Sequence, residues 1–232
     1  MDTAKDARIL VLEDALRRLS ELVSNRKLKF HIDYAKLSKT IQKAGTLIYE
    51  VKYSYLDAKL LADHSAVGGI AEEIGAFAGT YHAAVSAISF RPQSSKETLI
   101  TAEVDYCLRI VDGFRRRLLD HEEDPGFAVD MIVVEVSQVQ PLEGSKNLKL
   151  CRCTDGTRIW QIVTNLEGIS PSSRLACALL PPVEMMGVVS EAMFLGGDTL
   201  PESIGLGPLK NPSSKLLNQS RAQVAQIAKR MT

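Results

Sequence analysis

A change of apolar periodicity near residue 125 constrains this chain more than any other feature. Before it, apolar residues recur every three or four positions; after it, they stand in short runs rich in β-branched residues. The first pattern is typical of amphipathic helices and the second of strands. The segment between them, His121 to Gly126, is acidic and ends in Pro-Gly, which favours a domain boundary. We therefore expect an α+β multidomain protein, with an α-helical domain over residues 1–124, a β domain over 125–210 and a C-terminal helix over 211–232.

The helical half contains four apolar stripes. They run from Ile9 to Leu22, from Tyr34 to Ala62, from Val67 to Ile88 and from Ile100 to Leu118. Ser94 and Glu97 have the spacing of a capping box, in which a hydroxyl and a carboxylate satisfy free amides at a helix start. Four amphipathic helices with short connections predict an antiparallel bundle.

The second of these stripes, Tyr34 to Ala62, is heptad-like over about four repeats, a length typical of self-pairing helices. It can be buried inside a four-helix bundle or pair with a second copy of the chain. The stripe therefore offers one self-pairing surface for a homodimer, with internal burial as the alternative.

The β half contains five short runs with strand character. They are Met131–Val139, Leu148–Thr154, Arg158–Thr164, Leu175–Leu180 and Ala192–Leu195. Asp155-Gly156 supplies a hairpin turn between the second and third runs, because Asp-Gly readily adopts positive φ. Five short strands within about 70 residues predict a small β-barrel. After the last strand, Asn211-Pro212 is typical of a helix start, with Asn as the N-cap.

Charge is balanced over the whole chain but not along it. Lys and Arg total 28, as do Asp and Glu. Residues 1–125 carry 18 basic and 19 acidic side chains, residues 126–210 carry 6 and 9, and residues 211–232 carry 4 and none. The basic excess therefore lies in the C-terminal helix, where Lys215, Arg221, Lys229 and Arg230 surround a weak apolar face.

Composition favours an ordinary soluble protein. No apolar run approaches the ~20 residues that span a bilayer, and the N-terminus lacks the plan of a signal peptide. Four cysteines are few for a disulfide framework, so we expect reduced thiols and a cytoplasmic location.

Residues 127–207 resemble the tRNA-binding OB-fold domain that occurs alone, in methionyl-tRNA synthetase, in the phenylalanyl-tRNA synthetase β subunit and in synthetase-associated cofactors. The resemblance rests on five elements in order: Val134-Glu135-Val136, Gln140-Pro141 with Ser145-Lys146-Asn147-Leu148, Thr154-Asp155-Gly156, Ile162 to Leu166, and Pro182 to Met193. Four residues depart from the family pattern: Gln140 stands for His, Ala192 for Gly, and Glu184 and Met185 for residues that are often basic. The resemblance implies a five-stranded OB-fold barrel that binds structured tRNA without catalysis or cofactor, and an aminoacyl-tRNA synthetase as a second partner. Members of this family often pair through segments next to the OB-fold, so the resemblance also implies a homodimer.

The predicted RNA-binding residues are Lys146, Lys149, Arg152, Arg158, Asn165, Ser190 and Met193. The four cations lie on or beside the second and third strands, where they can meet phosphates. Ser190 and Met193 shape the end of the barrel, the hydroxyl either reaching the ligand or tying down the barrel end. Trp160 can stack on a base or be buried in the barrel.

Other chemistry finds little support in the sequence. Ser190 lacks a Gly-x-Ser-x-Gly context and no His follows it, which excludes a serine nucleophile of that kind. Cys151 and Cys153 share a strand face, but a structural zinc site normally needs four ligands, so we interpret them as small buried hydrophobes. The Arg115-Arg116-Arg117 cluster is interpreted as complementing a helix C-terminus. The alternative function is a protein–protein module that docks on an aminoacyl-tRNA synthetase or related partner with RNA binding reduced or lost, which the acidic β half favours.

Overall fold

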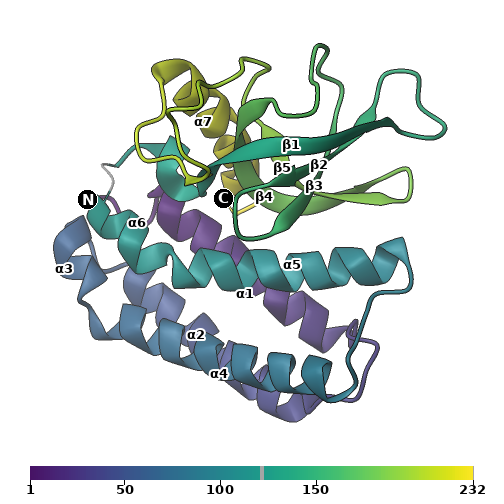
Figure 1. Ribbon diagram of the computed structural model, residues 1–232. Coiled ribbons are helices and arrows are strands. Elements are labelled where there is room, and N and C mark those ends of the chain that lie inside the picture. The colour runs from purple at the N-terminus through teal and green to yellow at the C-terminus, as the bar shows by residue number, and fades with distance from the viewer. Residues whose placement is uncertain (121–122, 232) are drawn as a thin grey trace. The chain divides into compact units, whose positions relative to one another are not determined.

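The computed structural model describes residues 1–120 and 123–231, which form two compact units (Figure 1). The helical unit comprises Met1–Ala128 and Val224–Thr232, and the sheet unit comprises Val129–Gln223. Of the predicted boundary segment, His121 and Glu122 lie outside the described residues. Within the described ranges, no helix combines the length and the apolar character that crossing a bilayer requires.

The helical unit is built on four long helices that pack through their apolar stripes (Figure 1). α2 lies against α1 and α4, and α1 also lies against α5. The bounds are α1 Ala7–Ser24, α2 Tyr34–Lys52, α3 Ala58–Ala62, α4 Ser65–Ala87, α5 Ser95–Asp112, α6 Phe114–Asp120 and the 3₁₀ helix η1 Pro125–Ala128. Side-chain caps start these helices: Asp6, Asp33 and Asp57 accept from backbone amides two or three residues ahead.

Two of the four predicted helices are interrupted, so six helices occupy the described residues up to 120. The second stripe breaks after Lys52, because Tyr55 adopts a positive φ of 54° and Asp57 caps a new helix. The fourth stripe breaks at Gly113, which is the C-cap of α5. Apolar spacing continued through both breaks, so periodicity alone could not reveal them.

The α2 part of the heptad-like stripe, which suggested a self-pairing surface, is buried within one chain. Leu37, Ala44 and Val51 are each 0% exposed. The alternative of internal burial is therefore confirmed for α2. This part of the stripe offers no free surface for a second copy.

The sheet unit is an antiparallel sheet with the strand order β3-β2-β1-β4-β5 (Figure 1). The strands are β1 Met131–Pro141, β2 Lys149–Thr154, β3 Ile159–Thr164, β4 Arg174–Met185, β5 Val188–Phe194 and the short β6 Gly207–Pro208, which pairs with β1. Its core is one apolar cluster that includes Val134, Cys151, Trp160, Cys177 and Phe194. The predicted hairpin at Asp155-Gly156 is confirmed, with φ of 91° at Gly156.

β4 runs five residues beyond the predicted end at Leu180. It continues through Pro181 and Pro182 because its register with β5 shifts between Leu179 and Val183, which releases the prolines from the ladder. No backbone ladder joins β3 to β5 within the described residues. The sheet is therefore open by its backbone hydrogen bonds, and the predicted closed barrel is not established.

The C-terminal helix α7 spans Ser214–Ala228. It begins two residues later than an N-cap at Asn211 predicts, because the Ser213 hydroxyl accepts from the Leu216 amide at 3.5 Å and so occupies the capping position. Leu216 and Ser220 are buried residues of the sheet unit, whereas Val224 and Ile227 are buried residues of the helical unit. The helix is therefore a structural element with buried positions along its length.

Candidate nucleic-acid interface

Two connections of the sheet unit touch each other: the β1–β2 loop, residues 142–148, and the β4–β5 turn, residues 185–188. Gly144 has a φ of 80°, and a Cβ placed on it would lie 2.8 Å from Met186 Cε. The loop is ordered by its own hydrogen bonds, from Leu142 N to Leu148 O at 2.9 Å and from Leu148 N to Ser145 Oγ at 3.1 Å. The two connections therefore form a continuous rim on the sheet unit.

The β4–β5 turn has two central residues, Met186 and Gly187, with φ of 51° and 82°. Met185 and Val188 pair across it. Two positive φ values match a type I′ turn, whose twist suits a tight hairpin. This geometry holds the Met186 side chain at the tip, where it is 54% exposed.

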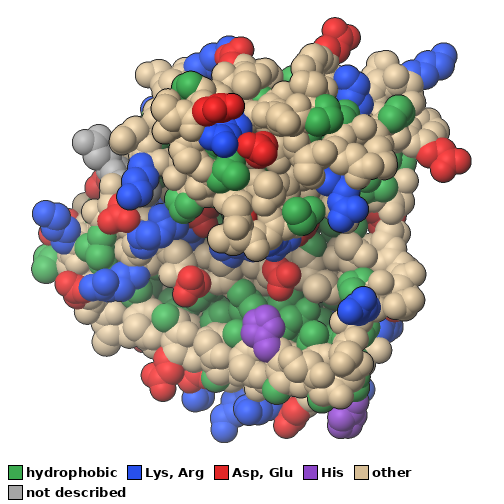
Figure 2. Space-filling model, in the orientation of Figure 1, with side chains coloured by type: hydrophobic (Ala, Val, Ile, Leu, Met, Phe, Trp, Pro, Cys, Tyr) green, Lys and Arg blue, Asp and Glu red, His purple; other side chains and the backbone are tan. Residues whose placement is uncertain are grey.

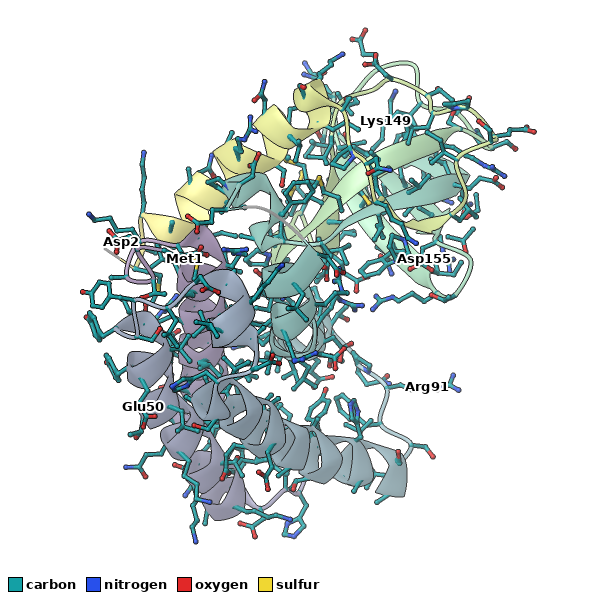
Figure 3. All side chains as sticks on the ribbon, turned by 90° about the vertical axis from the view of Figure 1, so that its left-hand side faces the viewer. Met1, Asp2, Glu50, Arg91, Lys149 and Asp155 are labelled. Carbon is teal, nitrogen blue, oxygen red and sulfur yellow. The ribbon has the colours of Figure 1, made fainter. Side chains whose placement is uncertain are left out.

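Three predicted cations lie near this rim or along β2. Lys146 is exposed in the β1–β2 loop, Lys149 is half-buried at the start of β2, and Arg152 is exposed and pairs with Gln161 of β3. None of the three has a carboxylate within ion-pair distance among the described residues. Figure 3 shows Lys149 and Asp155 at opposite ends of the β2–β3 hairpin.

The fourth predicted cation, Arg158, is half-buried and engaged by other side chains of the unit. Its guanidinium forms an ion pair with Glu191 of β5 and lies over the Trp160 ring, 3.9 Å from the ring centroid. Trp160 is 3% exposed, and its indole N–H donates to Asp155 Oδ2 at 2.8 Å. The interpretation of Trp160 as a buried residue is confirmed, and stacking on a base is excluded for this conformation.

Ser190 uses its hydroxyl within the sheet. It is 6% exposed, accepts from the Val163 amide at 3.0 Å and donates to Ala192 O at 3.0 Å. Of the two roles left open for this hydroxyl, tying strands together is the one seen. Asn165 is exposed directly after β3, and Met193 is half-buried on β5 opposite Ala178.

Asp155 organises the β2–β3 turn. Burial raises the pKa of its carboxyl, but hydrogen bonds from the Arg158 amide, from Thr157 and from the Trp160 indole outweigh burial and lower the pKa to about 2. The carboxylate therefore stays charged at every physiological pH. It fixes the turn and, through Trp160, the start of β3.

Sequence reasoning missed Glu191, although it binds Arg158 and accepts from the Gln161 amide at 3.4 Å. No pattern in the sequence reports this pairing, because it depends on how β3 and β5 lie against each other. Arg158 and Glu191 are 33 residues apart.

Two of the four cations in residues 211–232 also have polar partners within the chain. Lys215 forms an ion pair with Asp198, and Arg221 donates to Asn218 of its own helix. Lys229 and Arg230 are exposed at the end of the chain.

The other residues that the sequence singles out, in the arginine cluster and at the two strand cysteines, contribute to packing and hydrogen bonding. Arg117 is 1% exposed and donates to Ile110 O at the end of α5, which confirms the helix-end interpretation for this member of the arginine cluster. Burial raises the pKa of the Cys153 thiol to about 12, and Cys151 also lies in the apolar core. Among the described residues, no group of three or more His, Cys, Asp or Glu side chains could hold a metal ion.

The helical unit carries a groove of about 440 Å³ between α4 and α5. Figure 2 shows apolar side chains along its floor. Small residues of α4, namely Ala71, Gly75 and Ala78, face Asp105 and Arg109 of α5 across it. The groove brings together no nucleophile, base and orienting group of the kind that catalysis requires.

Comparisons with known proteins divide the chain in the same way as its periodicity. A family described as "Alpha helical domain" matches residues 1–120, and one described as "Putative tRNA binding domain" matches residues 131–216. The predicted resemblance of residues 127–207 to a tRNA-binding domain family is thereby confirmed. The description of this second family names tRNA binding and no catalytic activity. A MetRS-related protein from Pyrococcus horikoshii is similar over 40% of this chain and 90% of its own, with 21% identity and a TM-score of 0.30. No curated protein matches the chain.

Proposed function

The chain belongs to the family described as "Alpha helical domain", and from its second matched region we propose that the sheet unit binds structured tRNA without catalysis. The match of residues 131–216 to a putative tRNA-binding domain carries this proposal. Binding by shape and backbone contacts suits a surface of separate cations without a base-reading cluster.

We also propose that the sheet closes into an OB-fold barrel through side chains. β3 and β5 lie side by side. The amides of Gln161 and Val163, on the free edge of β3, donate to the side chains of Glu191 and Ser190 on β5. These bonds give the free amides of β3 hydrogen-bond acceptors that a backbone ladder would otherwise supply. They support a barrel in which side chains of β5, and not its backbone, join β3 to β5; we call this contact the side-chain seam.

The proposed RNA surface comprises the β1–β2 loop, the β4–β5 turn and the outer face of β2. OB-folds bind oligonucleotides with their β2–β3 face and with these two connections. Lys146, Lys149 and Arg152 supply the cations, and Asn165 supplies an amide near the end of β3. Arg158, Ser190 and Met193 support the surface from within the unit instead of touching phosphate.

The test is the salt dependence of tRNA binding. The variant Lys146→Gln should lower the log–log salt slope by about 0.7–0.9, because one phosphate contact is lost. Lys210→Gln is the matched control, since Lys210 is an exposed lysine of the same unit outside the proposed surface. Equal slopes for the two variants would refute the proposed surface.

A docking function has its own support in the sheet unit. Ile159, Val183 and Met186 are 47%, 49% and 54% exposed, and the unit carries more acidic than basic residues. An aminoacyl-tRNA synthetase is the partner that the sequence predicts. Met186→Asn should preserve the type I′ turn, since Asn tolerates positive φ. It should weaken docking but leave the salt slope of tRNA binding unchanged, because no charge is removed. Binding of purified methionyl-tRNA synthetase, measured by calorimetry with wild type and variant, separates the two functions.

The homodimer stays a prediction that rests on the family resemblance, because its second motivation, the heptad-like stripe, has weakened. The central part of the α2 stripe is buried within one chain. Light scattering that gives a mass near 25.4 kDa would establish a monomer.

A further inference from the structure

One end of the helical unit is formed by two loops, residues 25–33 between α1 and α2 and residues 88–94 between α4 and α5. Both preceding helices finish in the same motif. At α1, Lys27 N donates to Leu22 O at 2.9 Å and Arg26 has a φ of 47°. At α4, Phe90 N donates to Val85 O at 3.0 Å and Ser89 has a φ of 48°.

These are Schellman motifs, in which the left-handed position is usually glycine. Here that position is Arg26 in one loop and Ser89 in the other. The chain therefore places a cation at a backbone position where a side chain is disfavoured.

Aromatic rings join the two loops. The centroids of Phe30 and Phe90 are 4.9 Å apart, and Phe30 also lies 6.0 Å from Tyr81 of α4. Leu28 and Ile32 are buried and anchor the first loop, whereas Lys29 and His31 between them are exposed. Figure 3 shows Arg91 at the α4–α5 connection with its side chain directed away from the helices.

This end, which we call the basic end, concentrates unpaired cations. It comprises Arg26, Lys27, Lys29, Lys36, Arg91 and Lys96. The same segments contain two carboxylates, and both are engaged in helix caps: Asp33 accepts from the Lys36 amide at 3.0 Å and Glu97 from the Gln93 amide at 2.7 Å. Within the described part of the chain, none of the six cations forms an ion pair with a carboxylate.

Elsewhere in the helical unit, several cations are neutralised by carboxylates. Arg17 and Arg18 bind Asp14, Lys43 binds Glu73, and Lys52 binds Glu13. The basic end is thus a local excess of positive charge in a half-chain whose total is close to neutral. A fixed cluster of this kind attracts a polyanion at distances up to about a Debye length of 8 Å.

We propose that the basic end is a second RNA-contacting surface, which binds the phosphate backbone of tRNA. The cations meet phosphates, and the half-buried rings of Phe30 and Phe90 offer faces to sugars or unstacked bases. The choice of RNA as the polyanion rests on the proposed function of the sheet unit. The sheet unit contains nine acidic and eight basic residues and so has no net positive charge of its own. A tRNA-binding chain therefore gains from a cationic surface elsewhere.

The experiment compares two double variants of the full chain. Lys29→Gln with Arg91→Gln removes two charges from the basic end. Lys5→Gln with Lys59→Gln removes two exposed charges from elsewhere in the helical unit and serves as the control. Circular dichroism melts verify that both variants fold.

With total tRNA as the probe, the basic-end variant should bind about tenfold more weakly at low salt, and its salt slope should fall by about 1.4–1.8, as two lost phosphate contacts require. The control should match wild type. Equal slopes for both variants overturn the inference, as does a wild-type chain that binds no tRNA at low salt.

Two further comparisons separate this inference from the proposed function. A slope loss in the basic-end variant combined with no effect of Lys146→Gln keeps the inference and refutes the sheet surface. The second comparison measures binding to phosphatidylserine vesicles by wild type and by the basic-end variant. If the variant loses vesicle binding while its tRNA binding is unchanged, the surface binds membranes and the inference is wrong.

Discussion

At the scale of single residues, buried polar side chains stabilise the ends of secondary-structure elements. Arg117 and Arg8 are 1% and 2% exposed. Arg117 donates to Ile110 O at the end of α5, and Arg8 donates to Arg117 O at 3.4 Å while it pairs with Asp6. Removing one partner from such a contact leaves a buried group without its hydrogen bond, which costs more than the contact itself contributes.

Gly113→Ala should destabilise the helical unit by about 1–3 kcal/mol, because the new Cβ would collide with the Arg117 guanidinium and that buried group cannot move aside without losing Ile110 O. The matched control is Gly79→Ala on α4, where nothing lies within 4 Å of the new Cβ. That change should stabilise the chain by about 0.5–1 kcal/mol. Urea unfolding followed at 222 nm measures both, and a neutral Gly113→Ala would show that Arg117 relaxes freely.

Ser190→Ala should lower the unfolding free energy of the sheet unit by about 1–3 kcal/mol, since the Val163 amide and Ala192 carbonyl lose their shared partner. Ser170→Ala, at an exposed serine of the same unit, should change it by less than about 0.5 kcal/mol. Tryptophan fluorescence of the buried Trp160 reports this unfolding. If the two variants unfold alike, the side-chain seam between β3 and β5 is not a source of stability.

At the scale of elements, local signals in the sequence identified starts and turns well. The Ser94 and Glu97 pair caps α5, with Glu97 reaching the amide of Gln93, one residue before the N-cap. Asp155-Gly156 makes the predicted hairpin. These features could be predicted because each depends on residues a few positions apart.

Features that depend on residues far apart along the chain could not be predicted from the sequence. The path of β4 through Pro181 and Pro182 requires a register shift against β5, and the capture of Arg158 by Glu191 requires the approach of β3 to β5. For the candidate site, the sequence could therefore indicate which cations exist and where they lie along the strands. It could not indicate which of them an acidic neighbour neutralises.

The β2–β3 turn should make stability sensitive to acid. The folded pKa of Asp155 is about 2, below its ordinary value of 3.8, so its contribution is present above about pH 4 and is lost as pH falls toward 2. Asp155→Asn should reduce the loss of unfolding free energy that occurs as the pH falls over this range. Urea midpoints of both proteins, measured between pH 5 and pH 2, should converge as the pH falls. A constant gap between them would exclude a role for the charge.

At the scale of the whole molecule, the chain divides into two units, and the predicted independence of its halves can be tested with a fragment. The sequence placed the boundary at 124/125, and contacts place it between Ala128 and Val129. A fragment of residues 126–223 should melt cooperatively with a β-type circular dichroism spectrum, because it contains the sheet unit and its apolar core. An unfolded fragment would mean that the sheet cannot form without the rest of the chain.

The C-terminal helix combines buried side chains with positive charge, and the two contributions can be separated. Deleting residues 211–232 would remove the buried side chains of Val224 and Ile227 together with four positive charges. Lys229→Gln with Arg230→Gln tests the charge alone, because both side chains are exposed. If the tail contributes phosphate contacts, this variant should lower the salt slope of tRNA binding without changing the melting temperature. An unchanged slope would assign the tail to structure.

The discontinuity of the helical unit has a consequence during biosynthesis. Residues 224–232 belong to the unit that contains the N-terminus, yet a ribosome makes them only after the 95 residues of the sheet unit. At roughly 5–20 residues per second, the first 128 residues wait about 5–20 s for their last partners. During that interval the nascent helices lack the apolar side chains of Val224 and Ile227, so the helical unit can complete its apolar packing only after Ile227 has been made.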